Sequence, residues 1–331
     1  MTEFYRIKLI AAAILGAVTV LGFAPFYLFP IPVVTLALLL KFCRNSQSAW
    51  QIGLLGFSFG MGLFSAGVTW LYVSLHDFGA MPTHIAIVVL MILCIYMSLF
   101  PALSLYILAR LRISSTLLWS CVAAALWTLF EWLRGTLFTG FPWLAVGYSQ
   151  APSSPLVGFA PIIGVYGISF LLVLSAALLF LYIESRLKAW RYGALLVLVW
   201  LGGFVLQMID WTKPQGEPIT VSLLQGNISQ DLKWRDDHIE NTMEIYKKLI
   251  LESPSQLIVT PEISIPLFSN VVPAKYIAQL AEHARNNNGD VLIGLAEHGT
   301  NQGEYYNTMF SFGSAPEQSY RKYHLVPFGE Y

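Results

Sequence analysis

Cysteine is scarce in this chain of 331 residues, and the second half of the chain contains none. The three cysteines are Cys43, Cys94 and Cys121, and their spacing matches no metal-binding motif. Thiols this few imply no disulfide framework, and no metal site is expected. Residues 122–331 therefore offer no thiol that could serve as a nucleophile.

Charge is equally scarce, since only 11% of the residues are charged, against about 25% in ordinary soluble proteins. The shortage is confined to the first 210 residues, which hold ten Lys/Arg and five Asp/Glu, whereas the remainder holds nine and fourteen. The formal net charge is zero and no basic patch stands out, which argues against a nucleic-acid partner.

Long hydrophobic runs fill the charge-poor part. A bilayer core about 30 Å thick needs about 20 mostly apolar residues in a spanning helix. Seven segments are candidates, although the second is short enough to be re-entrant: 9–26, 29–42, 52–75, 85–109, 116–133, 156–183 and 192–208. The sequence predicts a polytopic α-helical membrane bundle over residues 1–210.

The basic residues between these segments predict the orientation. Nine lie in alternate loops on one side, and only Arg134 lies on the other. Because positively charged loops stay in the cytoplasm, the N-terminus is expected inside and everything after residue 208 outside. This assignment requires segment 29–42 to cross, since otherwise Lys41 and Arg44 would lie outside. The first segment could also be a signal peptide, but no small-residue cleavage site follows Phe23, so an uncleaved span is expected.

The segment 134–154 between the fifth and sixth spans is rich in glycine, proline and aromatic residues. Tryptophan and tyrosine favour the headgroup level of a membrane, so the simpler interpretation is an interfacial anchor. The alternative is a platform where lipid tails meet a soluble domain. Sequence alone favours the anchor.

The hydrophobic period changes beyond Gln215. Strands are predicted at 219–225, 257–260, 291–295 and 308–312, and helices at 234–252 and 274–288. Strands that alternate with helices and then follow one another indicate an α/β layered domain, which we place at 217–331.

Two residues of this domain have side chains suited to catalysis. Glu262 directly follows the apolar strand and Pro261, where a carboxylate is well placed to act as a general base. Lys322 follows the fourth strand after a short polar loop, and its charge could stabilise an oxyanion. Taken singly, a solvated turn carboxylate and a surface basic pair with Arg321 are the commoner explanations.

Three further residues are weaker candidates. His324 has no serine or cysteine partner in sight, so it is more often structural in such a setting. Glu330 follows Gly329 and is either a second site carboxylate or an exposed turn residue. Trp234 lies at a predicted helix start, where an aromatic ring either covers a site or caps the helix.

Taken together, the motifs of the whole chain resemble those of one family, the apolipoprotein N-acyltransferases of bacterial inner membranes, which carry a nitrilase-like domain. The matching stretches are 23–26 (FAPF), 70–74 (WLYVS), 78–79 (FG), 131–135 (EWLRG), 139–143 (TGFPW), 147–150 (GYSQ), 224–228 (LQGNI), 232–234 (LKW), 260–262 (TPE), 306–308 (YNT) and 322–330 (KYHLVPFGE). The last of these stretches and the FPW segment are the most specific.

This resemblance implies a fold, an activity and a location. The soluble part would be an incomplete αββα sandwich on the periplasmic side of the inner membrane. The family moves an acyl chain from a phospholipid donor to the N-terminal cysteine of a diacylated apolipoprotein through a thioester, without metal or organic cofactor. The corresponding residues are Glu262 as general base, Lys322 as oxyanion-stabilising cation, Glu330 as supporting carboxylate and Trp234 as an aromatic near the site. Arg134, Phe141 and Trp143 are candidates for the lipid-facing entrance.

The sequence departs from the family at the nucleophile. In the family this cysteine lies downstream of the motif at 322–330, and Cys121 falls inside a predicted span. We therefore expect a truncated or frame-interrupted product, or a partner polypeptide that supplies the remainder, and no catalysis by residues 1–331 alone. Half a sandwich is also expected to leave an unpaired sheet edge and exposed apolar faces.

Two other interpretations remain open. A membrane nitrilase-like amidase for another substrate would have little need of the FPW and YSQ segments. A non-catalytic binding or sensor protein would keep the scaffold without the nucleophile, and the nucleotide sequence after codon 331 would distinguish it from a broken enzyme. A transporter is least expected, because the spans hold almost no charged residues.

Overall fold

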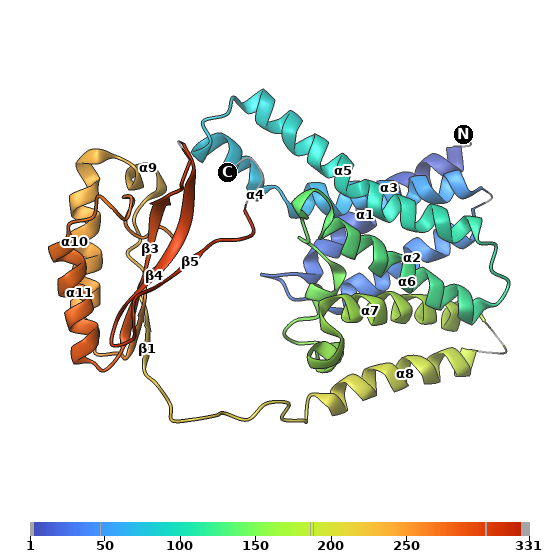
Figure 1. The fold of residues 1–331 in the computed structure, drawn as a ribbon. Coiled ribbons are helices and arrows are strands. Elements are labelled where there is room, and N and C mark those ends of the chain that lie inside the picture. The colour runs from blue at the N-terminus through green and yellow to red at the C-terminus, as the bar shows by residue number, and fades with distance from the viewer. Residues whose placement is uncertain (1–2, 47, 186, 188, 302, 326–331) are drawn as a thin grey trace. The chain divides into compact units, whose positions relative to one another are not determined.

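The computed structural model describes residues 3–325 apart from positions 47, 186, 188 and 302. Contacts divide the chain into two compact units, Met1–Lys213 and Pro214–Tyr331. Figure 1 shows the helices of the first unit and the mixed helices and strands of the second. Each unit is described by itself.

The first unit is all helical. Its α-helices are α1 (Glu3–Thr19), α2 (Pro30–Arg44), α3 (Ala49–Gly67), α4 (Trp70–Val73), α5 (Thr83–Arg110), α6 (Thr116–Arg134), α7 (Ala160–Glu184) and α8 (Ala189–Leu206). Short turns of other helix types are η1 (Val20–Gly22), η2 (Ser74–Phe78), η3 (Leu137–Thr139), η4 (Val146–Gln150) and η5 (Pro155–Phe159).

Six helical stretches in the described part of the chain are long and apolar enough to cross a membrane. They begin at Glu3, Ala49, Thr83, Thr116, Pro155 and Ala189, and they match six of the seven expected spans. The remaining expected span is α2, a helix of 15 residues, which at about 1.5 Å per residue is about 22 Å long. The crossing of α2 stays a prediction that rests on the charges of Lys41 and Arg44.

One predicted boundary is wrong. The expected span 52–75 ends early, because α3 stops at Gly67 and a separate helical segment, α4 followed by η2, begins at Trp70. Val68 and Thr69 stand at the break, and such β-branched residues are weaker helix formers than leucine or alanine.

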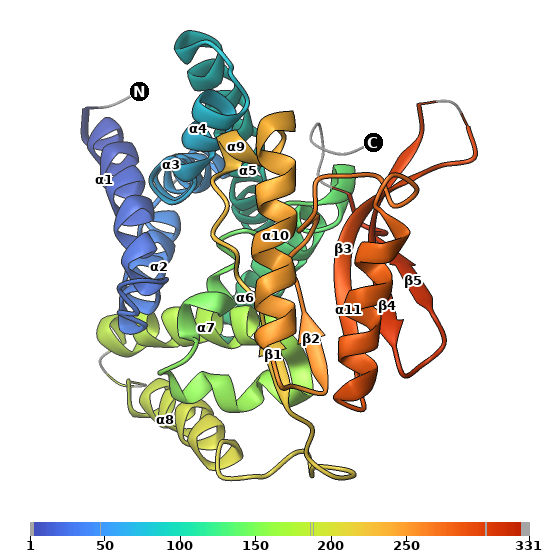
Figure 2. The same cartoon turned by 90° about the vertical axis from the view of Figure 1, so that its left-hand side faces the viewer.

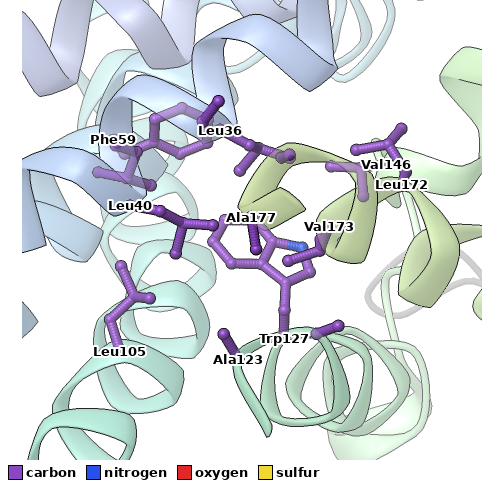
Figure 3. Packing of buried hydrophobic residues seen from close by; sticks show 14 of the residues in the cluster. Leu36, Leu40, Phe59, Leu105, Ala123, Trp127, Val146, Leu172, Val173 and Ala177 are labelled. Carbon is purple, nitrogen blue, oxygen red and sulfur yellow. The ribbon is translucent and has the colours of Figure 1, made fainter. Parts of the chain in front are cut away.

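The core of the bundle brings together side chains of α2, α3, α5, α6 and α7. Figure 3 shows Leu36, Leu40, Phe59 and Trp127 converging on it from three helices. The rings of Phe59 and Trp127 meet edge to face, with centroids 5.9 Å apart, an arrangement that aromatic pairs prefer. Helices α1 and α3 approach closely at Gly62, which has no side chain. A Cβ at this position would lie only 1.8 Å from the Ala13 carbonyl oxygen.

The second unit is built on one mixed sheet of five strands in the order β1-β2-β3-β4-β5. The strands are β1 (Val221–Leu223), β2 (Leu257–Val259), β3 (Asp290–His298), β4 (Tyr305–Gly313) and β5 (Gln318–Arg321). The first three are mutually parallel, and β4 and β5 are antiparallel to their neighbours. The helices are α9 (Gln230–Lys233), α10 (Asp236–Glu252) and α11 (Ala274–Asn286).

Helices α10 and α11 cover the same face of this sheet (Figures 1 and 2). Ile258, Val291, Ile293 and Leu295 of β2 and β3 are buried in the core that forms with these helices. The edge strand β1 is less protected, since Leu223 is 78% exposed. The expected α/β layering is confirmed, with helices on one face of the sheet.

The polar strand β5 is a correction to the sequence prediction, which treated 313–320 as a loop. Its residues Gln318–Arg321 are all exposed and show no apolar alternation. They form a strand because they pair with Thr308–Ser311 of β4 at the edge of the sheet. Polar residues are a common protection for such an edge.

Candidate active site

Glu262 lies in a tight loop that immediately follows β2. The buried hydroxyl of Thr260 is 2.8 Å from that of Ser264 and donates to the Leu292 carbonyl at 3.1 Å. Ile263 has φ of 42°, a conformation that side chains other than glycine adopt rarely. These contacts fix the loop against β3 and direct the Glu262 carboxylate to the end of the strand.

Gly294 allows this loop to lie directly on β3. A Cβ at this position would be 2.5 Å from the Pro261 carbonyl oxygen and 2.6 Å from the Ile263 nitrogen. No side chain fits in that space, so the position of Glu262 depends on a glycine in the neighbouring strand.

The carboxylate of Glu262 is paired with the ammonium group of Lys322. Its Nζ donates to the Glu262 Oε1 at 3.0 Å, although the two residues are 60 positions apart. Lys322 directly follows β5, and its backbone amide donates to the Asn307 carbonyl at 2.8 Å. The antiparallel pairing of β4 and β5 therefore delivers the lysine to the end of β2.

Arg321 does not form a surface pair with Lys322. It points to Glu297 of β3, where its Nη2 and Nε donate to the two carboxylate oxygens at 2.9 and 3.0 Å. The Thr308 hydroxyl donates to the same carboxylate at 3.0 Å. The hydrogen bond from Arg321 lowers the pKa of the Glu297 carboxyl below its ordinary value, and burial opposes this shift. The two adjacent basic residues thus serve different carboxylates.

Asn307 is a site residue that the sequence prediction missed. Its side-chain amide donates to the Glu262 carboxylate, so Glu262 receives hydrogen bonds from both Asn307 and Lys322. The motif at 306–308 contains this residue, but Asn307 lies just before the predicted strand 308–312, and a lone asparagine there gives no indication of a catalytic role. Its role becomes visible only through the β3–β4 register, which pairs Asn307 with Ala296.

Helix α9 adds a second ammonium group. Lys233 Nζ donates to the backbone carbonyl of Glu262 at 3.3 Å. Burial lowers the pKa of Lys233 below its ordinary value, and the negative charge of Glu262 opposes the shift. Trp234 ends this helix as its C-cap and is 56% exposed, so its ring is available to cover a bound molecule.

Two of the other candidates need separate mention. Glu330 lies outside the described residues, so its place in a site stays a prediction. His324 is exposed, and its place in a site stays a prediction. Among the described positions, no group of three or more His, Cys, Asp or Glu residues is arranged to hold a metal ion.

The remaining candidates lie in the first unit, where side chains of α6 form hydrogen bonds with the backbone of the loop that follows this helix. Arg134 is buried, and its Nη1 donates to the carbonyls of Phe141 and Trp143 at 2.7 and 2.6 Å. One turn earlier, Glu131 accepts hydrogen bonds from the Val146 amide at 2.9 Å and the Trp127 ring at 3.0 Å. The loop is therefore fixed at three points by two charged side chains of one helix.

The outer side of this loop is apolar and accessible. Trp143 is 50% exposed, and its ring centroid lies 5.2 Å from that of Trp70, which is 45% exposed. Phe141 is half-buried and its ring lies 6.4 Å from that of Trp143. The aromatic side chains thus stand toward the surroundings of the bundle, while Arg134 faces inward.

Comparison with known proteins links both units to one family. The family model "Apolipoprotein N-acyltransferase N-terminal domain" matches residues 15–178, and the model "Carbon-nitrogen hydrolase" matches residues 220–331. The apolipoprotein N-acyltransferase of Nitrosomonas europaea is 63% identical over all of this chain, which covers 66% of that protein. Those of Chromobacterium violaceum and Ralstonia nicotianae are 36% and 38% identical over 98% and 97% of the chain, which covers 63% and 62% of them. The chain spans just under two thirds of the length of these relatives.

Proposed function

Because the chain belongs to the apolipoprotein N-acyltransferase family, we propose that it supplies the base and the cation of a lipid acyl-transfer site. The acyl donor is a bacterial phospholipid, and the acceptor is the N-terminal amine of a diacylated apolipoprotein. The reaction takes place on the periplasmic face of the inner membrane, in the bilayer that the first unit spans. The observation that carries the proposal is the 3.0 Å hydrogen bond between Lys322 and Glu262.

The chemistry proceeds in two acyl transfers through a thioester. Glu262 takes the proton of a thiol, and the thiolate attacks the ester carbonyl of the phospholipid. Glu262 then gives this proton to the leaving oxygen, which releases a lysophospholipid and returns Glu262 to its carboxylate form. The amine of the acceptor then attacks the thioester carbonyl, and Glu262 takes the amine proton as the thiol is released. In both steps the ammonium of Lys322 stabilises the negative charge on the carbonyl oxygen. No metal or organic cofactor takes part.

The thiol does not come from the second unit. The three cysteines of the chain lie at positions 43, 94 and 121, all within the helical unit, and residues 214–331 contain none. We propose that a cysteine outside residues 1–331, in the part of the relatives that this chain does not cover, completes the site. Residues 1–331 alone are then inactive in acyl transfer.

The loop after α6 contributes to lipid binding in this proposal. The exposed ring of Trp143 and the half-buried ring of Phe141 contact the acyl chain or headgroup of the donor, since aromatic rings favour the membrane interface. Arg134 acts through the loop, because its guanidinium is committed to the carbonyls of Phe141 and Trp143. In the second unit, the ring of Trp234 covers the acyl group. Glu330 is a second carboxylate that supports Glu262 and Lys322.

A chimera tests this function. Residues 1–331 are joined to the remaining C-terminal part of the Nitrosomonas europaea relative, which is 63% identical over this chain. The purified chimera and the chain alone are supplied with a phospholipid that has a labelled acyl chain and a diacylated lipopeptide, and transfer is measured by mass spectrometry. We expect transfer by the chimera and none by residues 1–331.

Charge-removing variants locate the chemistry. In the chimera, Glu262→Gln and Lys322→Met are each expected to lower the rate by about 10²-fold or more, the usual size of base and oxyanion effects. The matched controls Glu317→Gln and Lys275→Met change exposed residues and are expected to keep the full rate. Unchanged transfer by either site variant, or transfer by residues 1–331 alone, would contradict the proposal.

A further inference from the structure

A cavity lies at the opposite end of the helical unit from the loop that Arg134 holds. It has a volume of about 470 Å³, which falls in the range of about 300–1,000 Å³ typical of small-molecule sites. It opens between the end of α2, the start of α3, the end of α5 and the start of α6. Along α6, Trp119 of this cavity is separated from Arg134 by about 22 Å, at about 1.5 Å per residue.

Two arginines line the cavity from different segments. Arg44 is the last residue of α2, and Arg112 follows the end of α5. The guanidinium of Arg44 lies over the ring of Trp119, 5.5 Å from its centroid, a contact that orients the cation. Among the described residues neither arginine has a carboxylate within 4.0 Å, so their charge is available to a ligand.

The rest of the lining combines a polar and an apolar side. The hydroxyl-bearing residues Ser46 and Ser48 lie at the turn between α2 and α3, and Ile52 and Leu108 line the cavity from α3 and α5. The Ser46 hydroxyl donates to the Phe42 carbonyl at 2.8 Å, whereas the Ser48 hydroxyl accepts from the Gln51 amide at 3.2 Å and keeps its proton for a ligand. Two guanidinium groups with this hydroxyl nearby suit a phosphate, which arginine binds through paired hydrogen bonds. A free phosphate would make no favourable contact with the apolar side chains, whereas the glycerol and the first methylenes of a lipid would pack against them.

The side of the membrane follows from the loop charges. Lys41, Arg44, Arg110 and Arg112 belong to the loops that the positive-inside rule places in the cytoplasm. Basic pockets between helices at this level are known binding sites for anionic lipid headgroups. The acyl transfer proposed above takes place on the other side, so this cavity is separate from that site.

We propose that this cavity binds the phosphate headgroup of an anionic phospholipid from the cytoplasmic leaflet. The phosphodiester lies between Arg44 and Arg112, and the first part of an acyl chain lies along Ile52 and Leu108. The bound lipid joins the end of α2 to the ends of α5 and α6, because its one phosphate neutralises charges on both sides of the cavity. The helical unit is more stable with this lipid than without it.

The test uses the purified chain of residues 1–331 in a nonionic detergent. Phosphatidylglycerol, phosphatidylcholine, glycerol 3-phosphate and inorganic phosphate are added separately, and binding is followed by native mass spectrometry and by the thermal unfolding midpoint. We expect retention and a raised midpoint with phosphatidylglycerol only. Equal binding of phosphatidylcholine would overturn the charge argument, and equal binding of the free phosphates would overturn the assignment to a lipid.

Variants identify the site. Arg44→Gln and Arg112→Gln are each expected to weaken retention of phosphatidylglycerol roughly fivefold, the contribution of one basic residue near an anionic lipid surface. The control is Arg110→Gln, an exposed arginine that precedes Arg112 by two residues and does not line the cavity. It removes the same charge from the same loop, so an equal loss in this control would show a general surface effect and overturn the proposal.

A further variant leaves both charges in place. Ala109→Phe fills part of the apolar wall and is expected to reduce lipid retention while Arg44 and Arg112 remain. The far-ultraviolet circular dichroism of each variant confirms that the helices are intact. If this variant binds phosphatidylglycerol as tightly as the unmodified chain does, the lipid does not occupy the cavity.

Discussion

Asn307 and Lys322 face each other across the edge of the sheet, where the Lys322 amide donates to the Asn307 carbonyl at 2.8 Å. The side chains of both residues donate to the carboxylate of Glu262. A backbone contact thus fixes the separation of two donors, and the carboxylate on the neighbouring loop receives both of them. The geometry of the candidate site depends on how β4 pairs with β5.

Asn307 is therefore expected to be a positioning residue. In the chimera, Asn307→Leu removes one donor to Glu262 but keeps the backbone bond to Lys322, so the rate should fall by up to about 10²-fold, the loss that a displacement of about 1 Å can cause. The unfolding midpoint should change little. Asn307→Asp separates position from charge, since it adds a repelling carboxylate next to Glu262 and should be worse than Asn307→Leu. An unchanged rate in both variants would show that Lys322 alone holds the carboxylate.

Gly294 is expected to be intolerant of the smallest side chain. The methyl group of Gly294→Ala would lie 2.5 Å from the Pro261 carbonyl oxygen, so the loop that carries Glu262 must move away from β3. We expect the chimera to lose most of its rate and to unfold at a lower temperature. Gly202→Ala is the control, because its added methyl group meets only the Phe159 ring, at 3.5 Å, and should be tolerated. Full activity of Gly294→Ala would mean that the loop adapts without moving the carboxylate.

The loop after α6 offers a prediction on stability. Arg134→Met leaves the partly buried carbonyls of Phe141 and Trp143 without this donor, at a cost of at most about 1–3 kcal/mol for each. We expect a lower unfolding midpoint in detergent and faster proteolysis between residues 134 and 146. Arg134→Lys keeps the charge but has one point donor in place of the guanidinium, so it should restore only part of the stability.

The Trp143→Ala variant tests whether the exposed ring of Trp143 contacts the phospholipid without contributing to stability. Trp143→Ala keeps the backbone carbonyl that Arg134 binds and removes the exposed ring. It should preserve the unfolding midpoint and raise the KM for the phospholipid in the chimera. If Trp143→Ala and Arg134→Met lower stability equally, the ring is a packing element and not a lipid contact.

The parts of the site that the sequence could predict are those set by local patterns. A buried strand followed by Pro261 and Glu262 places the carboxylate at a strand end, and β2 does end there. The meeting of Glu262 with Lys322 depends on β5, a polar edge strand that has no apolar alternation to reveal it. Asn307 was missed for the same reason, because its role comes from pairing between strands and not from its neighbours in sequence.

In the helical unit, too, the sequence predicts some features and not others. Hydropathy predicts the long helices, because each must bury about 20 apolar residues in lipid. Hydropathy says little about α2, whose 15 residues are mostly packed inside the bundle. The inward direction of Arg134 was also beyond reach, since a single arginine after an apolar run is expected at the interface until its loop partners are known.

The pairing of Glu297 with Arg321 makes stability depend on pH in a defined direction. The hydrogen bond from Arg321 lowers the pKa of the folded Glu297 carboxyl below the unfolded value of about 4.3. The contribution to stability is therefore complete above about pH 4.3, falls as the pH decreases, and is lost once the pH passes below the folded pKa.

Near-ultraviolet circular dichroism of the unmodified chain and of Glu297→Gln should give unfolding midpoints that differ at pH 7 and converge toward pH 3. The control Glu317→Gln, at an exposed residue of the turn before β5, should track the unmodified chain throughout. A difference for Glu297→Gln that stays constant from pH 7 to pH 3 would mean that its effect is one of packing, and the ion pair could then not be what keeps Arg321 apart from Lys322.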